Sequence, residues 1–185
     1  MTISLGSVKI THPVFLAPLS GITDLPMRRI VRKQGVGLVF SEMLASRELL
    51  SRPIAQQRRL RSTEDEKPLA IQIAGCEPYW MGEAARICAD MGAEIIDINM
   101  GCPAKKVVNG FSGSALMRDL DLAAALIAAT VQAVAVPVTL KMRTGWDDGN
   151  RNAPQLAQRA ETLGVQLITV HGRTRCQFYN GRADW

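Results

Sequence analysis

A cysteine lies just past the end of an apolar stretch near the middle of the chain, in the segment DINMGCPAKKVVNGFSGSAL at residues 97–116. Cys102 stands in a Gly-Cys-Pro turn, and Lys105 and Lys106 follow closely. Most cysteines are small buried hydrophobic residues, but a thiol in a tight turn beside positive charge is suited to chemistry. The lysines could favour a thiolate that acts as a nucleophile or metal ligand, whereas a protonated thiol could act as a general acid. The residues alone leave these roles open.

The loop behind this cysteine, NGFSGSA, is a second candidate for binding. Its backbone N–H groups and the two lysines could together cradle a polyanion, although turn glycines in a solvated loop have the same pattern. The loop is not a P-loop, because no Gly-Lys-Ser or Gly-Lys-Thr follows its glycines.

Two cations lie close together near the end of another apolar stretch. Lys141 and Arg143 are two residues apart, so on a strand they share one face. Two unpaired cations inside a barrel would be costly, so they need an anionic ligand or a carboxylate partner. We expect a ligand, and a structural salt bridge to Glu42 or Asp97 is the alternative.

His171 stands before a glycine at the end of a later apolar stretch. It could contact a phosphate or a cofactor beside Lys141 and Arg143, or it could form a thiol–imidazole nucleophile pair with Cys102. The chain has two histidines and no HxH or HExxH spacing, so we expect no metal site.

The elements that must position these residues follow a repeating order of amphipathic helix, glycine and short apolar strand. Helices are expected at residues 24–34, 77–91 and 152–163, each followed by a C-cap glycine. The first should bury a stripe of Met27, Ile30 and Val31. The expected strands are VFLAP, GLVFSEM, PLAIQIAG, EIIDINM, VPVTLKMR and LITVHG. Such nearly continuous apolar runs are typical of a parallel sheet covered by helices, which predicts an α/β fold.

Polar side chains near the carboxyl ends of the strands favour a closed barrel over an open doubly wound sheet. They occur on almost every expected strand, as Ser41, Glu42, Gln72, Asp97, Asn99, Lys141, Arg143 and His171. In a TIM (β/α)8 barrel the carboxyl ends of all strands meet at one active-site mouth, whereas an open sheet needs polar ends only at its switch point. About six βα units are visible, so we expect an incomplete barrel that is the N-terminal part of a longer protein.

The composition suits a globular protein with an anionic partner. The net charge is +5, with a pI of about 9.3, and nucleic acid is one partner that such a charge attracts. No signal peptide or membrane-spanning stretch is evident, and four cysteines without framework spacing indicate a reduced, cytoplasmic setting. Basic runs modestly favour an RNA-facing surface and comprise Arg28, Arg29, Arg32, Lys33, Arg58, Arg59 and Arg61.

Several motifs in order resemble one known family. APLSGITDLPMR, SEM, QIAG, DINMGCPAKKV, GSALMRD, KMRTGW and HGRTR look like the motifs of tRNA-dihydrouridine synthases, with the bacterial B-type subgroup most similar. The resemblance covers essentially the whole chain. It implies an FMN-dependent TIM-barrel enzyme that uses NADPH, or NADH, to reduce the C5–C6 double bond of uridines in the tRNA D-loop.

The resemblance also implies roles for individual residues. Cys102 matches the family's proton donor to C5, on the face of the base opposite the flavin that delivers hydride to C6. Lys105 and Lys106 would meet RNA phosphate. Cofactor contacts are implied for Pro18, Leu19, Ser20, Gln72, Lys141 and His171, and contacts to the uracil edge for Asn99 and Arg143.

The resemblance sets the expected domain organisation. Residues 1–185 correspond to the N-terminal portion of the FMN-binding barrel, and the family continues into the last barrel strands and a helical tRNA-binding domain. We expect the full-length form to be a monomer, and the chain alone to bind FMN poorly. Two alternatives are a flavin barrel acting on a free pyrimidine, like dihydroorotate dehydrogenase, and a non-catalytic RNA-binding barrel.

Overall fold

The computed structural model describes residues 2–51 and 63–185, so Arg58, Arg59 and Arg61 lie outside the described residues. The strands are β1 (Ile3–Leu5), β2 (Val8–Ile10), β3 (Phe15–Leu16), β4 (Leu38–Phe40), β5 (Leu44–Ala45), β6 (Leu69–Ala74), β7 (Ile95–Met100), β8 (Val138–Arg143) and β9 (Leu167–His171). The α-helices are α1 (Leu25–Lys33), α2 (Ser46–Ser51), α4 (Pro78–Asp90), α5 (Lys105–Asn109), α6 (Leu120–Ala133) and α7 (Ala153–Thr162). Two 3-10 helices are η1 (Glu64–Glu66) and η2 (Gly113–Arg118).

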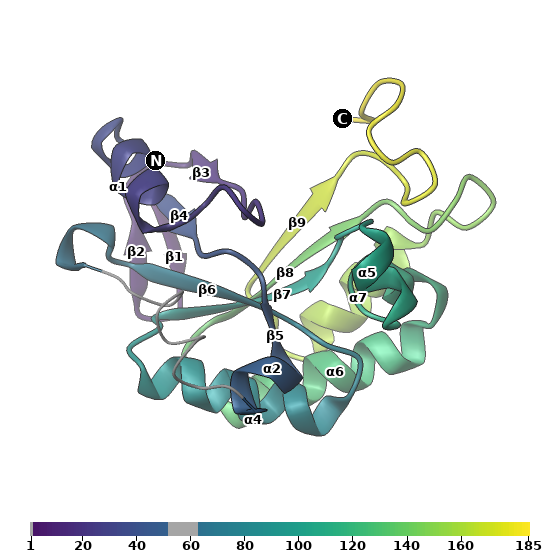
Figure 1. The fold of residues 1–185 in the computed structure, drawn as a ribbon, viewed down its shortest axis with the longest axis horizontal. Coiled ribbons are helices and arrows are strands. Elements are labelled where there is room, and N and C mark those ends of the chain that lie inside the picture. The colour runs from purple at the N-terminus through teal and green to yellow at the C-terminus, as the bar shows by residue number, and fades with distance from the viewer. Residues whose placement is uncertain (1, 52–62) are drawn as a thin grey trace.

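The main sheet is parallel and its strands are arranged in the order of the sequence. The path runs β3-β4-β6-β7-β8-β9, and the short strand β5 pairs with β6 beyond the end of β4. A doubly wound sheet would reverse its strand order at a switch point, and no reversal occurs along this path. The sheet curls in one direction (Figure 1), which confirms the expected α/β fold and an incomplete TIM barrel, with six strands along this path among the described residues.

The large hydrophobic core lies between the sheet and the helices on its outer face. Helices α4, α6 and α7 cover this face (Figure 1), and their buried residues pack against isoleucines, leucines and methionines of β6, β7 and β8. Strand residues alternate between the two faces of a sheet. The outward positions of these strands therefore hold the core, and the inward positions are left for the polar residues of the site.

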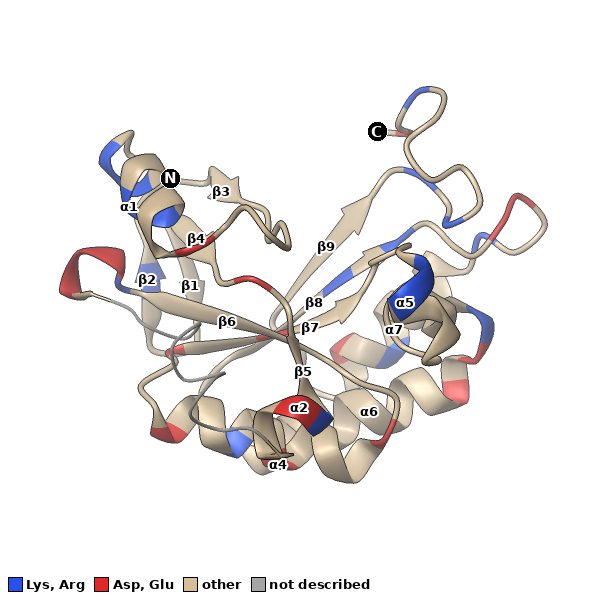
Figure 2. Ribbon diagram, viewed as in Figure 1, with Lys and Arg blue, Asp and Glu red and all other residues tan. Residues whose placement is uncertain are grey.

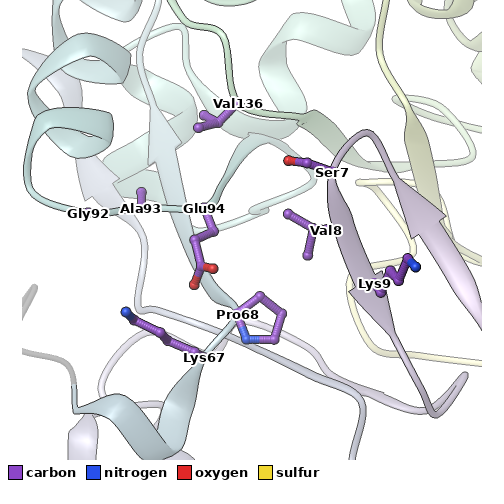
Figure 3. Close-up of a pocket in the computed structure, with 9 residues that line it drawn as sticks. All are labelled: Ser7, Val8, Lys9, Lys67, Pro68, Gly92, Ala93, Glu94 and Val136. Atoms are coloured by element: carbon purple, nitrogen blue, oxygen red, sulfur yellow. The ribbon is translucent and has the colours of Figure 1, made fainter.

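A two-stranded hairpin that the sequence did not predict lies beside the amino ends of the main-sheet strands. Strands β1 and β2 are antiparallel, and Leu5 and Ile10 form a second apolar cluster with Leu38, Phe40 and Ile95. Beside the hairpin is a hollow of about 500 Å³ at the amino ends of β6 to β8 (Figure 3), which contains no predicted site residue. In barrels this end serves stability rather than chemistry.

The helix ends match the sequence signals. Gly35, Gly92 and Gly164 follow α1, α4 and α7 with φ angles of 87°, 92° and 98°. This left-handed conformation is strained for residues that have a side chain. The predicted C-caps of these three helices are therefore confirmed.

Helix α1 corrects two expectations. Its predicted apolar stripe is only partly buried, because Met27 and Val31 are half-buried while Ile30 is 60% exposed, and the fully buried residue of the helix is Arg28. The Arg28 guanidinium contacts the Glu66 carboxylate at 2.6 Å, and both side chains are almost fully buried. Arg29 pairs with Asp65, and Arg32 donates to backbone carbonyl groups. These arginines fasten α1 to η1 and the neighbouring turns. Arg28 is buried and so is not part of the solvated surface that the sequence suggested, whereas Arg29 is still about half exposed in its pair with Asp65.

The Arg28–Glu66 pair predicts a large effect of a single substitution. Glu66→Ala removes the carboxylate that faces a buried guanidinium, which typically costs about 3–5 kcal/mol. The free energy of unfolding, measured by urea denaturation, should fall by that amount. Glu64→Ala is the matched control in the same 3-10 helix, because the Glu64 side chain is exposed, and it should change the stability little. Equal losses of unfolding free energy in the two variants would show that the buried pair contributes no more to stability than an exposed glutamate.

Candidate active site

A pocket of about 600 Å³ opens at the carboxyl ends of the strands and collects most of the predicted site residues. Nine of the residues singled out from the sequence line it, namely Pro18, Leu19, Ser20, Gln72, Asn99, Cys102, Lys141, Arg143 and His171. They come from five segments that are far apart in the chain. The volume lies within the range of about 300–1,000 Å³ that is usual for small-molecule sites.

The register of the sheet explains why these side chains meet. Gln72 of β6 is paired with Asp97 of β7, Asn99 of β7 with Lys141 of β8, and Arg143 of β8 with His171 of β9. Paired residues on neighbouring strands point to the same face. The polar residues therefore form successive rows across the inner face, stepping toward the mouth of the barrel.

Cys102 is held by hydrogen bonds to its backbone. Asn99 Oδ1 accepts from the N–H groups of Gly101 (3.1 Å) and Cys102 (3.0 Å), as in an Asx turn. Ser114 donates to the Cys102 carbonyl through both its backbone N–H (3.1 Å) and its hydroxyl (2.9 Å). Arg143 Nε donates to the Gly101 carbonyl at 2.9 Å. The turn that presents the thiol is thus fixed from three sides.

The glycine-rich loop supports this turn from behind and does not form the polyanion cradle that we considered. Its backbone N–H groups at residues 110–112, 114 and 115 donate to carbonyl groups of the protein. Gly113 has a φ of 61° and lies so close to the Cys102 carbonyl that a Cβ atom would approach its oxygen to 2.8 Å. The role of the loop is therefore to pack against Cys102.

A chain of buried hydrogen bonds leads from the Cys102 turn into the sheet. Asn99 Nδ2 donates to Gln72 Oε1 at 2.8 Å, and Gln72 Nε2 donates to Asp97 Oδ2 at 2.6 Å. The other oxygen of Asp97 accepts from the Thr139 hydroxyl at 2.5 Å. The backbone N–H of Gln72 donates to Ser41 Oγ at 3.0 Å, in the gap between β4 and β5. All of these residues are buried.

Arg143 corrects the expectation that a buried cation here needs a ligand or a carboxylate. Its guanidinium donates to three backbone carbonyl groups, at Gly101, Thr174 (2.9 Å) and Phe178 (2.7 Å). No salt bridge from Arg143 to an acidic residue is found in the described part of the chain. Carbonyl dipoles therefore satisfy this charge, and Arg143 ties the Cys102 turn to the loop after β9.

Lys141 and His171 lie together on one side of the pocket. Burial lowers the pKa of Lys141, while the Asp97 charge opposes the shift. Burial, together with the charges of Arg143, Lys141 and Arg173, lowers the pKa of His171 to about 4. His171 is thus a neutral imidazole near pH 7, and Arg173 Nη1 lies 3.3 Å from its Nε2.

The segment after β3 forms the facing rim. Gly21 N donates to Glu42 Oε1 at 2.5 Å, and the Leu19 backbone N–H donates to the Thr23 hydroxyl at 3.1 Å. These bonds fasten a turn on which Leu19 is 44% exposed. Glu42 therefore anchors the rim and does not pair with Lys141 or Arg143.

Two aromatic residues of the pocket were missed from the sequence. Phe178 and Tyr179 belong to the loop after β9, line the pocket and contact each other edge to face. The Arg143 guanidinium lies 5.5 Å from the centre of the Tyr179 ring. The barrel rule that active sites use the loops beyond the strand ends could have indicated them, because this loop follows His171 directly.

The two predicted lysines lie outside the pocket. Lys105 and Lys106 do not line the pocket but are exposed at the start of α5, which Figure 2 shows beside the carboxyl end of β7.

All four cysteines are free. Burial raises the pKa of Cys88 in α4 to about 12, which makes that thiol inert. Cys102 is the cysteine that lines the pocket.

Two further features concern only the described residues. None of the helices there has the length and apolar character needed to cross a bilayer. Within the same ranges, no three side chains of His, Cys, Asp or Glu are grouped as metal ligands would be.

The buried carboxylate predicts an unusual pH dependence of stability. Burial raises the pKa of Asp97 to about 6, against the opposing hydrogen bonds from Thr139 and Gln72. The folded protein then holds this proton more tightly than the unfolded chain, so stability falls as pH rises from about 4 to about 6. The free energy of unfolding of the wild type minus that of Asp97→Asn should fall by on the order of 3 kcal/mol between these limits. A difference that is constant or rises with pH would contradict this.

His171 gives a second test of the electrostatics. Its imidazole should stay neutral down to about pH 5, as observed by NMR titration of the ring nitrogens. Lys141→Met removes a neighbouring charge and should raise the pKa of His171, though not to its usual value, because burial is the larger cause. Arg86→Met on α4 is the control and should leave the titration unchanged. An imidazole that is protonated at pH 6.5 in the wild type would overturn the assignment.

Comparison with known proteins gives consistent matches along the chain. The family model for dihydrouridine synthase (Dus) matches residues 15–185. A probable tRNA-dihydrouridine synthase of Rhizobium leguminosarum bv. phaseoli is 58% identical over 178 residues, covering 96% of this chain and 56% of that protein. One from Rickettsia bellii is 55% identical over 184 residues, covering 99% of this chain and 56% of its own. The chain spans about half the length of these curated relatives.

Two more distant matches are informative. tRNA-dihydrouridine synthase B of Xanthomonas campestris pv. campestris is 48% identical over 181 residues, covering 98% of this chain and 54% of that protein. Among solved structures, the carboxyl transferase domain of Rhizobium etli pyruvate carboxylase with pyruvate has a TM-score of 0.53, with 15% identity over 78% of this chain and 23% of that one. The last likeness concerns the fold alone. The family match and the identity of the relatives confirm the family that the motifs indicated, and the chain belongs to the dihydrouridine synthase family.

Proposed function

We propose that the protein containing this chain reduces uridine to 5,6-dihydrouridine in the D-loop of tRNA, with FMN in the pocket, NADPH as reductant and Cys102 as proton donor. The observation that carries this proposal is the position of Cys102. Its thiol-bearing turn is held by Asn99, Ser114 and Arg143, and it lines the same pocket as Lys141 and His171. The proposed proton donor and the proposed cofactor contacts therefore line the same pocket.

The pocket fits a flavin in size and in the chemistry of its lining. Leu19, Ile22 and Pro18 supply apolar surface for a flat ring, and Lys141 and His171 supply polar contacts on the strands. When bound, FMN would supply the hydride for C6 of the uracil. Lys141 would hold a cation near the flavin and could stabilise negative charge on its ring system. The neutral His171 could donate or accept a hydrogen bond without adding charge.

The proposed role of Cys102 is general acid catalysis at C5. Such a role needs a donor held in a fixed position relative to the base, since proton transfer requires hydrogen-bond reach. The bonds to Asn99 and Ser114 supply that fixed position. The nucleophile pair with His171 has no comparable support, because the hydrogen-bond neighbour of the imidazole is Arg173.

Exposed positive charge at the mouth supports RNA as the substrate class. Lys105 and Lys106 lie just past Cys102 at the start of α5 and are free to meet RNA phosphate groups. A uracil stacked in RNA keeps its C5 and C6 atoms out of reach of a pocket at a barrel mouth. We therefore propose that the target base is flipped out of its stack into the pocket.

A cellular map of dihydrouridine tests this function. In cells that lack the complete gene, mass spectrometry of tRNA should show loss of dihydrouridine at one or more D-loop positions, and the wild-type gene should restore it. Cys102→Ala should not restore it, because loss of a general acid costs about 100-fold or more in rate. Cys176→Ala, an exposed cysteine of the loop after β9, is the control and should restore it fully.

Two outcomes would contradict the proposal. One is full restoration by Cys102→Ala, which would remove the thiol from the chemistry. The other is an unchanged map together with activity of the purified protein on free uracil, which would favour a free pyrimidine as substrate.

A further inference from the structure

The hydrogen-bond chain from Asp97 to Cys102 has a fixed direction. At one end, a carboxylate offers only acceptor oxygens when ionised. At the other end, the backbone N–H groups of Gly101 and Cys102 are only donors. Between them, the amides of Gln72 and Asn99 each have one donor side and one acceptor side. A single arrangement satisfies every link, with both amide nitrogens toward Asp97 and both amide oxygens toward Cys102, and this is the arrangement observed.

Burial makes this direction matter. Gln72, Asp97 and Asn99 are 1%, 2% and 8% exposed. If one amide turned over, two donors or two acceptors would face each other, and a buried polar group without a partner costs about 1–3 kcal/mol. Hydrogen bonds to an ionised group are roughly twice as strong as neutral ones, so the link to Asp97 is the strongest constraint on the Gln72 amide.

The direction also decides what the pocket presents to a ligand. Gln72 and Asn99 both line the pocket. Each amide uses one N–H in the chain, and the second N–H of each makes no hydrogen bond among the residues that the structure describes. With both oxygens turned toward Cys102, the two residues can offer the pocket N–H donors, which suit the carbonyl oxygens of a pyrimidine or a flavin.

We infer that Asp97 is a positioning residue for Cys102, acting through Gln72 and Asn99 to hold the backbone of the Cys102 turn and to direct both amides as donors. Asp97 does not itself line the pocket. The inference rests on the proposed function where it concerns proton donation, and it rests on the observed hydrogen bonds where it concerns the turn.

The burial of the carboxylate supports this role. The pKa of Asp97 is raised to about 6 because the charged form is poorly solvated. A carboxylate kept in such a place lowers the stability of the fold at neutral pH, and a residue that serves packing alone would avoid that cost. The neighbouring Thr139 hydroxyl hydrogen-bonds the other oxygen of Asp97, away from Gln72. It therefore provides a matched control.

The test measures amide hydrogen exchange of Gly101 and Cys102 by NMR in the complete gene product. Asp97→Leu removes the acceptor at similar size, and Gln72→Met cuts the chain one step nearer to Cys102. Each should speed exchange of these two amides at least tenfold. The double variant should be no more than about threefold faster than either single variant, because both break the same chain. Thr139→Val should leave the two amides within about threefold of wild type.

A kinetic measurement separates positioning from a general loss of structure. Asp97→Leu should lower kcat for dihydrouridine formation at least tenfold and leave KM for tRNA within about twofold. The amides of Ile96 and Ile98 in β7 should stay as protected as they are in Thr139→Val, which shows that the strand is intact.

Three results would overturn the inference. They are wild-type exchange at Gly101 and Cys102 in Asp97→Leu, multiplied effects in the double variant, and equal loss of protection along all of β7. A wild-type protein that forms no dihydrouridine would count against the proposed function alone. The exchange rates would still decide whether Asp97 holds the turn.

Discussion

The hydrogen bond between the Gln72 amide and the Asp97 carboxylate is the interaction on which the site depends. It joins two neighbouring strands across the inner face of the sheet at 2.6 Å, where both side chains are buried. From it the direction of the Asn99 amide follows, and from Asn99 the conformation of the Cys102 turn. A rigid parallel sheet can hold such a chain because its register fixes which residues stand side by side, and sites built on strands are more precise than sites on loops.

The same face shows how a barrel mouth accommodates positive charge. Arg143 is satisfied by three carbonyl groups, so it serves as a clamp between the Cys102 turn and the loop after β9. Burial lowers the pKa of Lys141, and the Asp97 charge opposes that shift. His171 is neutral near pH 7 because its pKa is lowered. One cation of the pocket is therefore structural, and Lys141 is a second cation that lines it. Helix α1 uses its arginines in the same structural way.

The fold and the membership of the pocket could be predicted from the sequence, but the partners within it could not. Continuous apolar strands with polar carboxyl ends predicted the barrel, because covered parallel sheets permit few other patterns. That rule also placed Gln72, Asn99 and Cys102 together. It could not show that the partners of Arg143 are carbonyl groups, because backbone acceptors carry no sequence signal. The hairpin β1–β2 was missed because its strands are only three residues long. The exposure of Ile30 was missed because apolar periodicity alone does not show which face of a helix is buried.

We propose above that Cys102, a side chain held in one position, delivers the proton to C5 of the flipped uracil. The most direct measurement is to run the reaction of the complete gene product on unmodified tRNA in D₂O and to locate deuterium at C5 of the product by NMR. A proton delivered by a thiol held in one position should place deuterium on a single face of C5. Deuterium spread equally over both faces would mean that water supplies the proton at random and that Cys102 is not the donor.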